Sequence, residues 1–370
     1  AVEAGKINAD LTVGIDVTSA VALEANLGLS FMGMIPHGEG FFLTAEQAGK
    51  FGLGSTPTIS DIIRPFRNGK DLMRTPRNIF VIDCFGLSAD DLRTRHPSIF
   101  QWLYDRVKPE RDHNPRESRR KKWWLFAESV PKFRRAGASL SRYIATCRTA
   151  KHRAFVWMDA SVLPDSKIIA IALDTPFHLG VLSSHIHCRW AERAGSHHGV
   201  GNDPNYNNSL CFDRFPFPHC SLSVMKAIGE LANQIDEHRK HQLAKHSGLT
   251  ITGLYNVLAK LRGGEALTAK EKVINEQGFC GVLRDLHDRL DAAVADAYGW
   301  PVDLPEAAIL ERLVRLNAER AREEKRGLIR WLRPEYQQPA GVVTAKMVAK
   351  AKPAGAKRAA EAKSSRARKS

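Results

Sequence analysis

The 370-residue chain is long enough for about two or three domains, and 43% of its residues are hydrophobic, which excludes global disorder. Its formal net charge is +15, so a polyanionic partner is expected, with nucleic acid as the first candidate. The densest apolar run, residues 168–173, is much shorter than the ~20 residues that a membrane-spanning helix needs. An integral membrane protein is therefore excluded, and no membrane partner is expected.

The positive charge is concentrated in two regions. Residues 340–370 hold nine Lys and Arg against one Glu, and residues 105–153 hold fifteen Lys and Arg against five acidic residues. The six cysteines are scattered without a C-x-x-C pair, which predicts neither a disulfide framework nor a zinc ribbon and fits a reducing cytoplasm. The N-terminus lacks both a signal peptide and an initiator Met, which suggests that the chain begins partway into a longer protein.

Residues 1–220 have a mixed pattern in which short apolar runs alternate with turn residues. Five of these runs predict strands, at 79–83, 123–126, 142–146, 154–157 and 168–173. Helices are predicted at 98–107 and 177–194; in the second, Leu179, Leu182, Ile186 and Trp190 share one face. Residues 199–208 form a turn cluster, and the alternating prolines at 215–218 exclude regular structure.

Residues 221–335 have helical patterns throughout. Ser223 is a candidate cap for the first helix, and the capping box of Thr268 and Glu271 predicts the start of a long helix that ends at Tyr298. Another helix is predicted to begin at residues 303–306. Residues 337–370 carry almost no large apolar side chains and are expected to be a disordered basic tail.

The chain shows no convincing catalytic motif. The Gly-x-Gly strings at 52–54 and 199–201 lack the context of a dinucleotide or adenosyl site, and a Gly-x-Ser-x-Gly elbow is absent. His185 and His187 would diverge by about 200° on a helix, so they should not share a metal ion. The sequence therefore predicts no catalytic, cofactor or metal residue. A metal-dependent nuclease built on the histidines is an alternative that His187→Ala would test.

Three basic clusters indicate nucleic-acid binding instead, because Lys and Arg at turns can hold phosphates. The second cluster runs directly into two tryptophans. A solvated surface would explain any one cluster, but the three together with the net charge favour nucleic acid. The candidate phosphate contacts are Arg64, Arg67, Asn68 and Lys70 in the first cluster, Arg119, Arg120, Lys121 and Lys122 in the second, and Lys151 and Arg153 in the third.

The order of the motifs resembles a known family. The strings at 64–72 (Arg-Pro-Phe-Arg-Asn-Gly-Lys-Asp-Leu), 142–146, 151–153, 180–184, 186–187, 190 and 215–218 (Phe-Pro-Phe-Pro) follow the same order as in the large adenine-specific DNA methyltransferases of bacterial restriction–modification systems, including the type IIG/IIL enzymes. The resemblance covers roughly residues 1–335. It corresponds to the target-recognition domain and the C-terminal helical region of those enzymes.

This resemblance implies an α+β fold. Residues 1–55 would be a lead-in from an upstream methyltransferase domain, and residues 56–220 the mixed α/β target-recognition domain. Residues 221–336 would form a C-terminal helical bundle, followed by the basic tail at 337–370. The implied partners are double-stranded DNA, a methyltransferase catalytic domain upstream or on a separate chain, and, in the fused members, a nuclease domain. The implied location is the bacterial cytoplasm.

The chain departs from the family in its catalytic motifs. It has neither the Asn-Pro-Pro-Tyr/Phe string that holds the target adenine nor the Gly-rich turn for S-adenosylmethionine; the nearest string, at 202–206, has Asn205 in place of the second Pro and is interpreted as a decoy. The expected function is therefore DNA recognition for a separate catalytic half that flips and methylates adenine at N6, in restriction–modification or phage defence. S-adenosylmethionine would belong to that half. The alternative is a stand-alone specificity subunit that acts with a separate catalytic chain.

The family also implies where bases are read, namely in the loop just before the Phe-Pro-Phe-Pro element. Asn can pair bidentately with adenine and Asp can accept from cytosine N4, each good pair contributing ~1–3 kcal/mol of discrimination. The candidate base-reading residues are Ser196, His197, His198, Asn202, Asp203 and Asn205.

Overall fold

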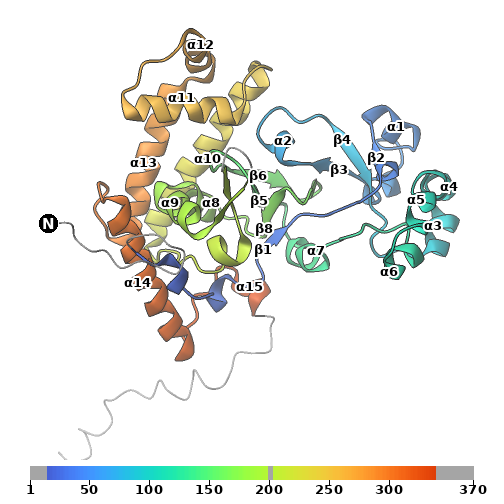
Figure 1. Ribbon diagram of the computed structural model, residues 1–370, viewed down its shortest axis with the longest axis horizontal. Coiled ribbons are helices and arrows are strands. Elements are labelled where there is room, and N and C mark those ends of the chain that lie inside the picture. Colours follow the sequence, from blue (N-terminus) through green and yellow to red (C-terminus); the bar gives the residue numbers. More distant parts are fainter. Residues whose placement is uncertain (1–14, 199–202, 339–370) are drawn as a thin grey trace, which may run out of the picture. The chain divides into compact units, whose positions relative to one another are not determined.

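The computed structural model describes residues 15–198 and 203–338. The chain forms two units, Ala1–Leu332 and Arg333–Ser370. The second is described only as far as residue 338 and holds the short helix α15 (Pro334–Gln337); most of the expected basic tail therefore lies outside the described residues. In the first unit the predicted fold class is confirmed, because a mixed α/β region precedes a series of helices (Figure 1).

The central sheet has four antiparallel strands in the order β1-β8-β5-β6. Their bounds are β1 Ser30–Met32, β8 Ile168–Ile171, β5 Arg142–Cys147 and β6 Phe155–Asp159, which confirms three of the predicted strands. Ile144 of β5 lies opposite both Ile171 and Trp157. Nearly every residue of β5, β6 and β8 is buried, as in a sheet covered on both faces. β1 comes from the segment expected to be a lead-in, so part of that segment belongs to the sheet.

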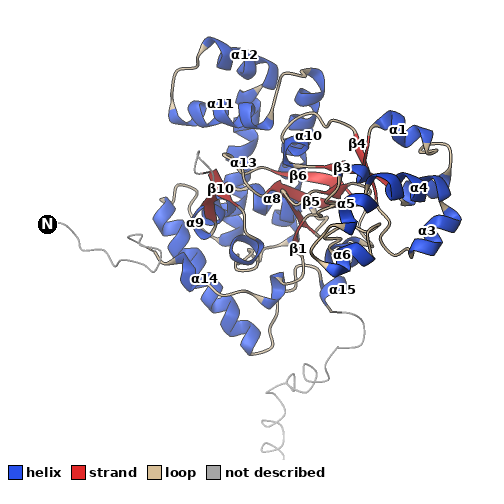
Figure 2. Cartoon of the chain, turned by 45° about the vertical axis from the view of Figure 1, so that its right-hand side comes forward, coloured by secondary structure: helices blue, strands red, loops and turns tan. Residues whose placement is uncertain are grey.

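A second sheet has the strand order β2-β4-β3-β7. Its strands are β2 Phe42–Leu43, β4 Ile79–Ile82, β3 Ile63–Arg67 and β7 Leu163–Pro164. β3 pairs parallel with β7 and antiparallel with β4. The predicted strand at 79–83 is thus confirmed, and the turn after β3 carries the first basic cluster into the short helix α2 (Gly69–Leu72). In Figure 2 the strands of both sheets lie between the later helices and the early helices.

Most of the early helices lie beside the second sheet (Figure 1), whereas the last of them packs Phe133 against Phe31 of β1 and Tyr143 of β5 in the central sheet. Their bounds are α1 Ala45–Lys50, α3 Ala89–Arg95, α4 Pro97–Arg106, α5 Lys108–Asp112, α6 Glu117–Lys121 and α7 Pro131–Gly137, so the predicted helix at 98–107 is confirmed. The predicted strand at 123–126 is wrong. Trp123 instead packs edge-on against Phe100 and Tyr104 of α4, with ring centroids 5.6 and 5.8 Å apart. The aromatic run fits a strand pattern, but a helix covers it.

The predicted helix at 177–194 is two helices, α8 (Pro176–Ser183) and α9 (His185–Ala194). Ser184 between them is extended, and its hydroxyl accepts a hydrogen bond from the His187 N–H. Serine is a favoured N-cap because its side chain satisfies an unpaired N–H of the first turn. The apolar face is nevertheless as predicted: Leu179, Leu182, Ile186 and Trp190 are all buried.

The later helices are α10 Leu222–Lys245, α11 Ile251–Gly263, α12 Ala269–Gly278, α13 Cys280–Tyr298 and α14 Glu306–Lys325. Ser221, rather than Ser223, caps α10. The Thr268 capping box is confirmed, but the long helix predicted from it breaks at Phe279, where φ is +44°. A Cβ on Gly278 would lie 2.2 Å from Leu254 Cδ2, so the chain turns where it meets α11. No described helix is long and apolar enough to cross a membrane.

A buried polar network ties the later helices to the central sheet. The Arg239 guanidinium on α10 donates to the Phe155 carbonyl of β6 (2.7 Å) and to the Tyr255 hydroxyl of α11 (3.0 Å). That hydroxyl also contacts His287 Nε2 of α13 at 2.8 Å. Asp236 pairs with Arg239 at 3.4 Å and supplies the opposite charge. Because a buried charge without partners is strongly destabilising, this network fixes the position of three helices against β6.

Candidate nucleic-acid interface

The predicted base-reading segment folds into a two-stranded hairpin. β9 (Ser196–His198) pairs antiparallel with β10 (Asp203–Asn205), with Ser196 opposite Asn205 and His198 opposite Asp203. Five of the six candidates are thereby brought together on one hairpin. The sixth, Asn202, lies outside the described residues.

The hairpin is attached to the central sheet by Asn205 and by the segment that follows β5. Asn205 is 3% exposed; its amide nitrogen donates to Ser196 Oγ (3.1 Å), and its amide oxygen accepts from the Thr149 hydroxyl (3.3 Å). Gly195 permits this close approach, because a Cβ there would lie 2.4 Å from the Asn205 carbonyl oxygen. The Asn205 side chain therefore holds the hairpin in place.

Arg153 makes a second attachment. Its guanidinium donates to the carbonyl of Cys147 at the end of β5 and to the carbonyl of Pro204 in β10, the latter at 3.0 Å. Its guanidinium carbon also lies 5.2 Å from the centre of the Tyr206 ring. Burial lowers the pKa of Arg153 from its ordinary value, yet an Arg side chain stays protonated in proteins. A residue predicted to contact phosphate thus bonds instead to two backbone carbonyls that join strand and hairpin.

An aromatic layer lies beneath the hairpin. His187 is fully buried, its Nε2 is 3.0 Å from the Tyr206 hydroxyl, and its ring packs edge-on against Phe215 of the Phe-Pro-Phe-Pro element at 4.4 Å. Burial, reinforced by the nearby Arg153 charge, lowers the pKa of His187 to about 3, so its imidazole is neutral. Tyr206 is 1% exposed. The tyrosine of the decoy string is therefore a core residue and is not available to stack on a base.

The first basic cluster adjoins the third at the end of β5. Asn68 caps α2 by accepting from the N–H groups of Lys70 and Asp71, and the Cys147 thiol donates to the Gly69 carbonyl at 3.3 Å. Cys147 thus lies between the Asn68–Lys70 turn and Arg153. Lys70 is exposed, and Arg67 is half-buried. Arg64 is directed elsewhere and donates to the carbonyls of Ser161 (2.8 Å) and Ala160 (2.9 Å).

The second basic cluster lies apart from the other two, on and just after α6 among the early helices (Figure 1). Arg119 pairs with Glu128 at 3.3 Å, and Lys121 pairs with Glu117 at 2.7 Å. Arg120 donates to the Asn114 carbonyl at 2.6 Å. Lys122 is exposed. The structure therefore brings the first and third clusters together at the end of β5, where the hairpin is attached, and places the second cluster elsewhere.

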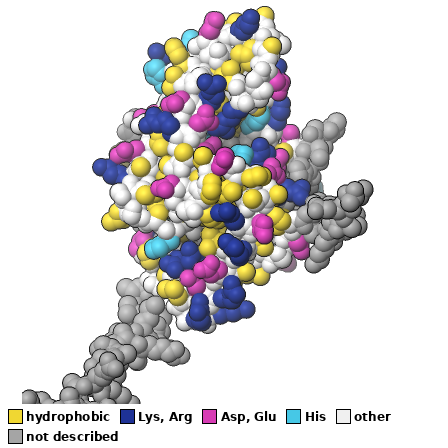
Figure 3. Space-filling view, turned by 90° about the vertical axis from the view of Figure 1, so that its left-hand side faces the viewer, with side chains coloured by type: hydrophobic (Ala, Val, Ile, Leu, Met, Phe, Trp, Pro, Cys, Tyr) yellow, Lys and Arg dark blue, Asp and Glu magenta, His cyan; other side chains and the backbone are white. Residues whose placement is uncertain are grey.

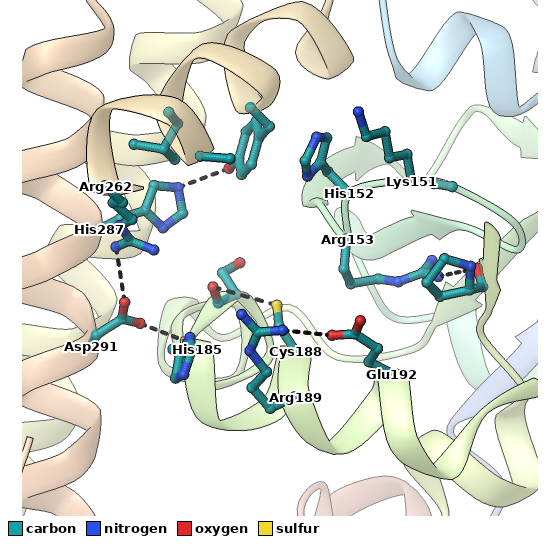
Figure 4. Close-up of a pocket in the computed structure, with 16 residues that line it drawn as sticks. Lys151, His152, Arg153, His185, Cys188, Arg189, Glu192, Arg262, His287 and Asp291 are labelled. Atoms are coloured by element: carbon teal, nitrogen blue, oxygen red, sulfur yellow. Dashed lines mark hydrogen bonds and ion pairs between the residues drawn. The ribbon is translucent and has the colours of Figure 1, made fainter. Parts of the chain in front are cut away.

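A cavity of about 460 Å³ opens beside the hairpin. Figure 4 shows Lys151, His152 and Arg153 on one side of it and Arg262 and His287 on the other. The α9 face that completes it is formed by His185, Cys188, Arg189 and Glu192. Pro204 of β10 also lines this cavity, so it is continuous with the hairpin.

Sequence reasoning missed the cavity residues of the later helices. Tyr255, Leu258, Ala259 and Arg262 follow one another at helical spacing on α11, and His287 and Asp291 are four residues apart on α13. Residues three and four apart share a helix face. That spacing was visible in the sequence, but nothing in it showed that the two faces meet α9.

The outer face of the later helices has a different character. In Figure 3, which presents that side of the molecule, Lys and Arg side chains are interspersed with Asp and Glu. Ion pairs such as Lys260–Glu271 and Arg262–Asp288 account for part of this mixture. A mixed surface of this kind is typical of solvated helices and not of a DNA-binding face.

The histidine pair considered as a metal site is separated by the fold. His187 lies in the aromatic core, whereas His185 lines the cavity. Among the residues that the structure describes, no three His, Cys, Asp or Glu side chains come together as a metal-binding group.

The family model described as "MmeI, target recognition domain" matches residues 21–219, which is more than half of the chain. The chain belongs to the MmeI target recognition domain family. The match includes both sheets, the hairpin and all three basic clusters, and it ends just after the Phe-Pro-Phe-Pro element.

Among solved structures, the chain resembles the type IIL restriction–modification enzyme MmeI, whose structure was determined in complex with DNA. The TM-score is 0.63 at 19% sequence identity, and the match covers 86% of this chain and 39% of that chain. Since the family model ends at residue 219, a match over 86% of the chain extends the shared fold into the later helices. A comparison with curated proteins found no match.

Proposed function

We propose that this chain is the DNA target recognition region of an MmeI-type restriction–modification enzyme and that its hairpin reads the base sequence. The observation that carries the proposal is the position of the hairpin: five candidate base-reading residues share it, and the Asn68–Lys70 turn and Lys151 adjoin its base. Phosphate contacts fix the register of a protein on DNA, while side chains in a groove distinguish the sequence. A hairpin flanked by cations supports both tasks.

The residues divide into readers and positioning residues. Ser196, His197, His198, Asn202 and Asp203 are the proposed readers. Asn205 and Arg153 hold the hairpin to the end of β5, as their hydrogen bonds show. Lys151 is exposed two residues before Arg153, and Lys70 is exposed on the turn that contacts Cys147; these two are the proposed phosphate contacts beside the hairpin. Arg67, Asn68 and the α6 cluster would add weaker, sequence-independent contacts.

The reaction served by this recognition is adenine-N6 methylation. Flipping a base out of a duplex costs a few kcal/mol, so the enzyme must first be anchored in register. This chain would supply the anchoring and the register. A catalytic half with an Asn-Pro-Pro-aromatic motif, which these 370 residues lack, would bind S-adenosylmethionine and transfer the methyl group, and a nuclease domain would be a further partner.

Selection from a random duplex library tests the proposal. The purified chain is expected to enrich one short sequence, and its affinity for that duplex should fall ~10³–10⁵-fold between 50 and 200 mM salt if about six to ten phosphates are contacted. His197→Ala or Asn202→Ala should change the enriched sequence. Deleting residues 340–370 should lower non-specific affinity and leave the preferred site unchanged. A chain that ignores duplex DNA at low salt would refute the proposal, and so would methyl transfer by the purified chain alone.

A further inference from the structure

The cavity beside the hairpin differs from the proposed reading surface in its lining residues and its chemistry. It lies between α9, α11, α13 and the segment before β6. At about 460 Å³ it falls within the usual 300–1,000 Å³ range of small-molecule sites. Ser196 and Asp203, the two proposed readers whose side chains the structure describes, do not line it, whereas Pro204, next to Asp203, does.

One wall of the cavity is apolar and aromatic. Tyr255 and Leu258 on α11 form it together with His152, whose ring centroid is 6.2 Å from that of Tyr255. Burial lowers the pKa of His152, which favours its neutral ring. The Tyr255 hydroxyl is held by Arg239 and His287, so the orientation of its ring is fixed. Tyr255 is 9% exposed and Leu258 is 4% exposed, so a narrow rigid strip of apolar surface faces the cavity, where a planar heteroaromatic ring can pack.

The opposite side carries a donor next to an acceptor. On α9, Arg189 Nη1 donates to Glu192 Oε2 at 2.9 Å, and Arg189 Nε lies 3.6 Å from Glu306 Oε2 of α14; both α9 side chains are partly exposed and keep further donor and acceptor positions. A guanidinium donates and a carboxylate accepts. That pair complements an amino group beside a ring nitrogen, which is the arrangement on the edge of adenine.

Lys151, a cation on a long side chain, lies at the mouth of the cavity. Its Nζ donates to Asn256 Oδ1 at 2.8 Å, and the residue is exposed. Arg262 is less available because it pairs with Asp288 and Asp291. An ammonium at the rim is well placed for a phosphate whose base lies inside.

From these four features we propose that the cavity binds a single nucleotide unit, with its base against Tyr255 and Leu258 and its phosphate at Lys151. If the nucleotide is part of a bound DNA strand, this inference rests on the proposed function. The same chemistry would also accept a free nucleotide. The two sources are separated by experiment.

The first arm uses the full chain and the duplex that it selects. Adenines are replaced one at a time by 2-aminopurine, whose fluorescence rises when it leaves the base stack. When the chain binds the duplex, we expect the 2-aminopurine fluorescence at one position to rise about fivefold or more. No catalytic half is present in this experiment, so the signal reports a pocket in this chain. The second arm measures binding of adenosine 5′-monophosphate alone by calorimetry.

A cavity-filling variant assigns either signal to the site. Ala259 lines the cavity at an exposed helical position, so Ala259→Phe fills it without changing the core. Ala292→Phe, at an exposed position on α13 away from the cavity, is the matched control. We expect Ala259→Phe to abolish the signal and Ala292→Phe to retain it. If circular dichroism shows that Ala259→Phe is unfolded, Lys151→Ala replaces it, with an expected loss of at least about tenfold in affinity for the nucleotide.

Each result has one meaning. A 2-aminopurine signal lost in Ala259→Phe identifies a nucleotide of the DNA strand, and monophosphate binding lost in Ala259→Phe identifies a free nucleotide. Absence of both signals in the wild-type chain overturns the inference, as does a signal that the filled cavity leaves unchanged. If the chain still selects a duplex in those cases, the proposed function survives. If it selects none, the proposed function fails, and the monophosphate arm still tests the cavity.

Discussion

Two basic clusters that look alike in the sequence have different tasks in the fold. Arg153 is enclosed at the base of the hairpin and bonds to the carbonyls of Cys147 and Pro204. Arg119 and Lys121 lie at α6, where each pairs with a nearby glutamate. The third cluster therefore includes an arginine that holds the hairpin in place, whereas the second is an ion-paired surface that ends at the exposed Lys122. A count of charges does not distinguish a cation that holds the backbone from one that faces a ligand.

The largest expected effect is on stability, and it separates the arginine of the third cluster that bonds to the backbone from the exposed lysine of the same cluster. Arg153→Ala leaves the Pro204 and Cys147 carbonyls without their donor, and we expect the free energy of unfolding to fall by about 3 kcal/mol. Lys151→Ala, two residues away and exposed, should change it by no more than about 0.5 kcal/mol while weakening DNA binding. Urea denaturation measures both. Equal losses in the two variants would show that Arg153 does not hold the hairpin.

The next effect concerns which base pairs the hairpin prefers. Asp203→Asn replaces an acceptor by a group that also donates, and we expect the preference at one base pair to change by about 1–3 kcal/mol with unfolding unaffected. Asp61→Asn, exposed and outside the hairpin, is the control and should leave the preference as it was. Competition between duplexes that differ at single positions measures this. An unchanged preference in Asp203→Asn would remove this residue from the set of readers.

A smaller effect tests the neutral layer under the hairpin through its pH dependence. The pKa of His187 is about 3 in the folded chain, below its ordinary value near 6.5, so the unfolded chain takes up a proton that the folded chain does not. The stability that depends on neutral His187 is fully present above pH 6.5 and is lost as the pH falls toward 3. His187→Phe should therefore reduce the slope of unfolding free energy against pH by up to about 1.4 kcal/mol per pH unit between pH 4 and 6.

The slope of the His187→Phe variant is compared with that of the wild-type chain, because other groups titrate in the same pH range. Burial raises the pKa of Asp213 to about 7, and this has the opposite sign: the folded chain holds a proton that the unfolded chain has released, so its contribution declines as the pH rises toward 7. Subtracting the variant from the wild type isolates His187. An identical slope in both would mean that this histidine titrates normally.

The smallest effect is expected at α6. Joint replacement of Arg120, Lys121 and Lys122 by Ala should weaken binding to all duplexes about equally and lower the salt slope by at most about 3, because each phosphate contact contributes about 0.9. Filter binding across several salt concentrations gives the slope. A change in the preferred sequence would contradict the separation of this cluster from the hairpin.

The sequence by itself determined the class of the fold and most of its elements. Strands such as 142–146 and 168–173 could be predicted because apolar runs of strand length end at turn residues. The Thr268 capping box could be predicted because it is a local hydrogen-bond pattern. The ordered motifs also indicated the recognition family, and they placed the candidate readers on one segment. All of these signals are carried by neighbouring residues, so no tertiary contact was needed to see them.

Only the tertiary structure decided which side chains are buried, which atoms form hydrogen bonds and which residues line a cavity. It covered the aromatic run at 123–126 with a helix, broke the predicted helices at Ser184 and Phe279, and buried Asn205 at the end of the hairpin, where its side chain bonds to Thr149. It also brought Tyr255 and Arg189, which are 66 positions apart, to one cavity. Hydrogen-bond partners and cavities are made by residues distant in the chain, and their energies depend on burial and geometry, which local sequence patterns do not encode.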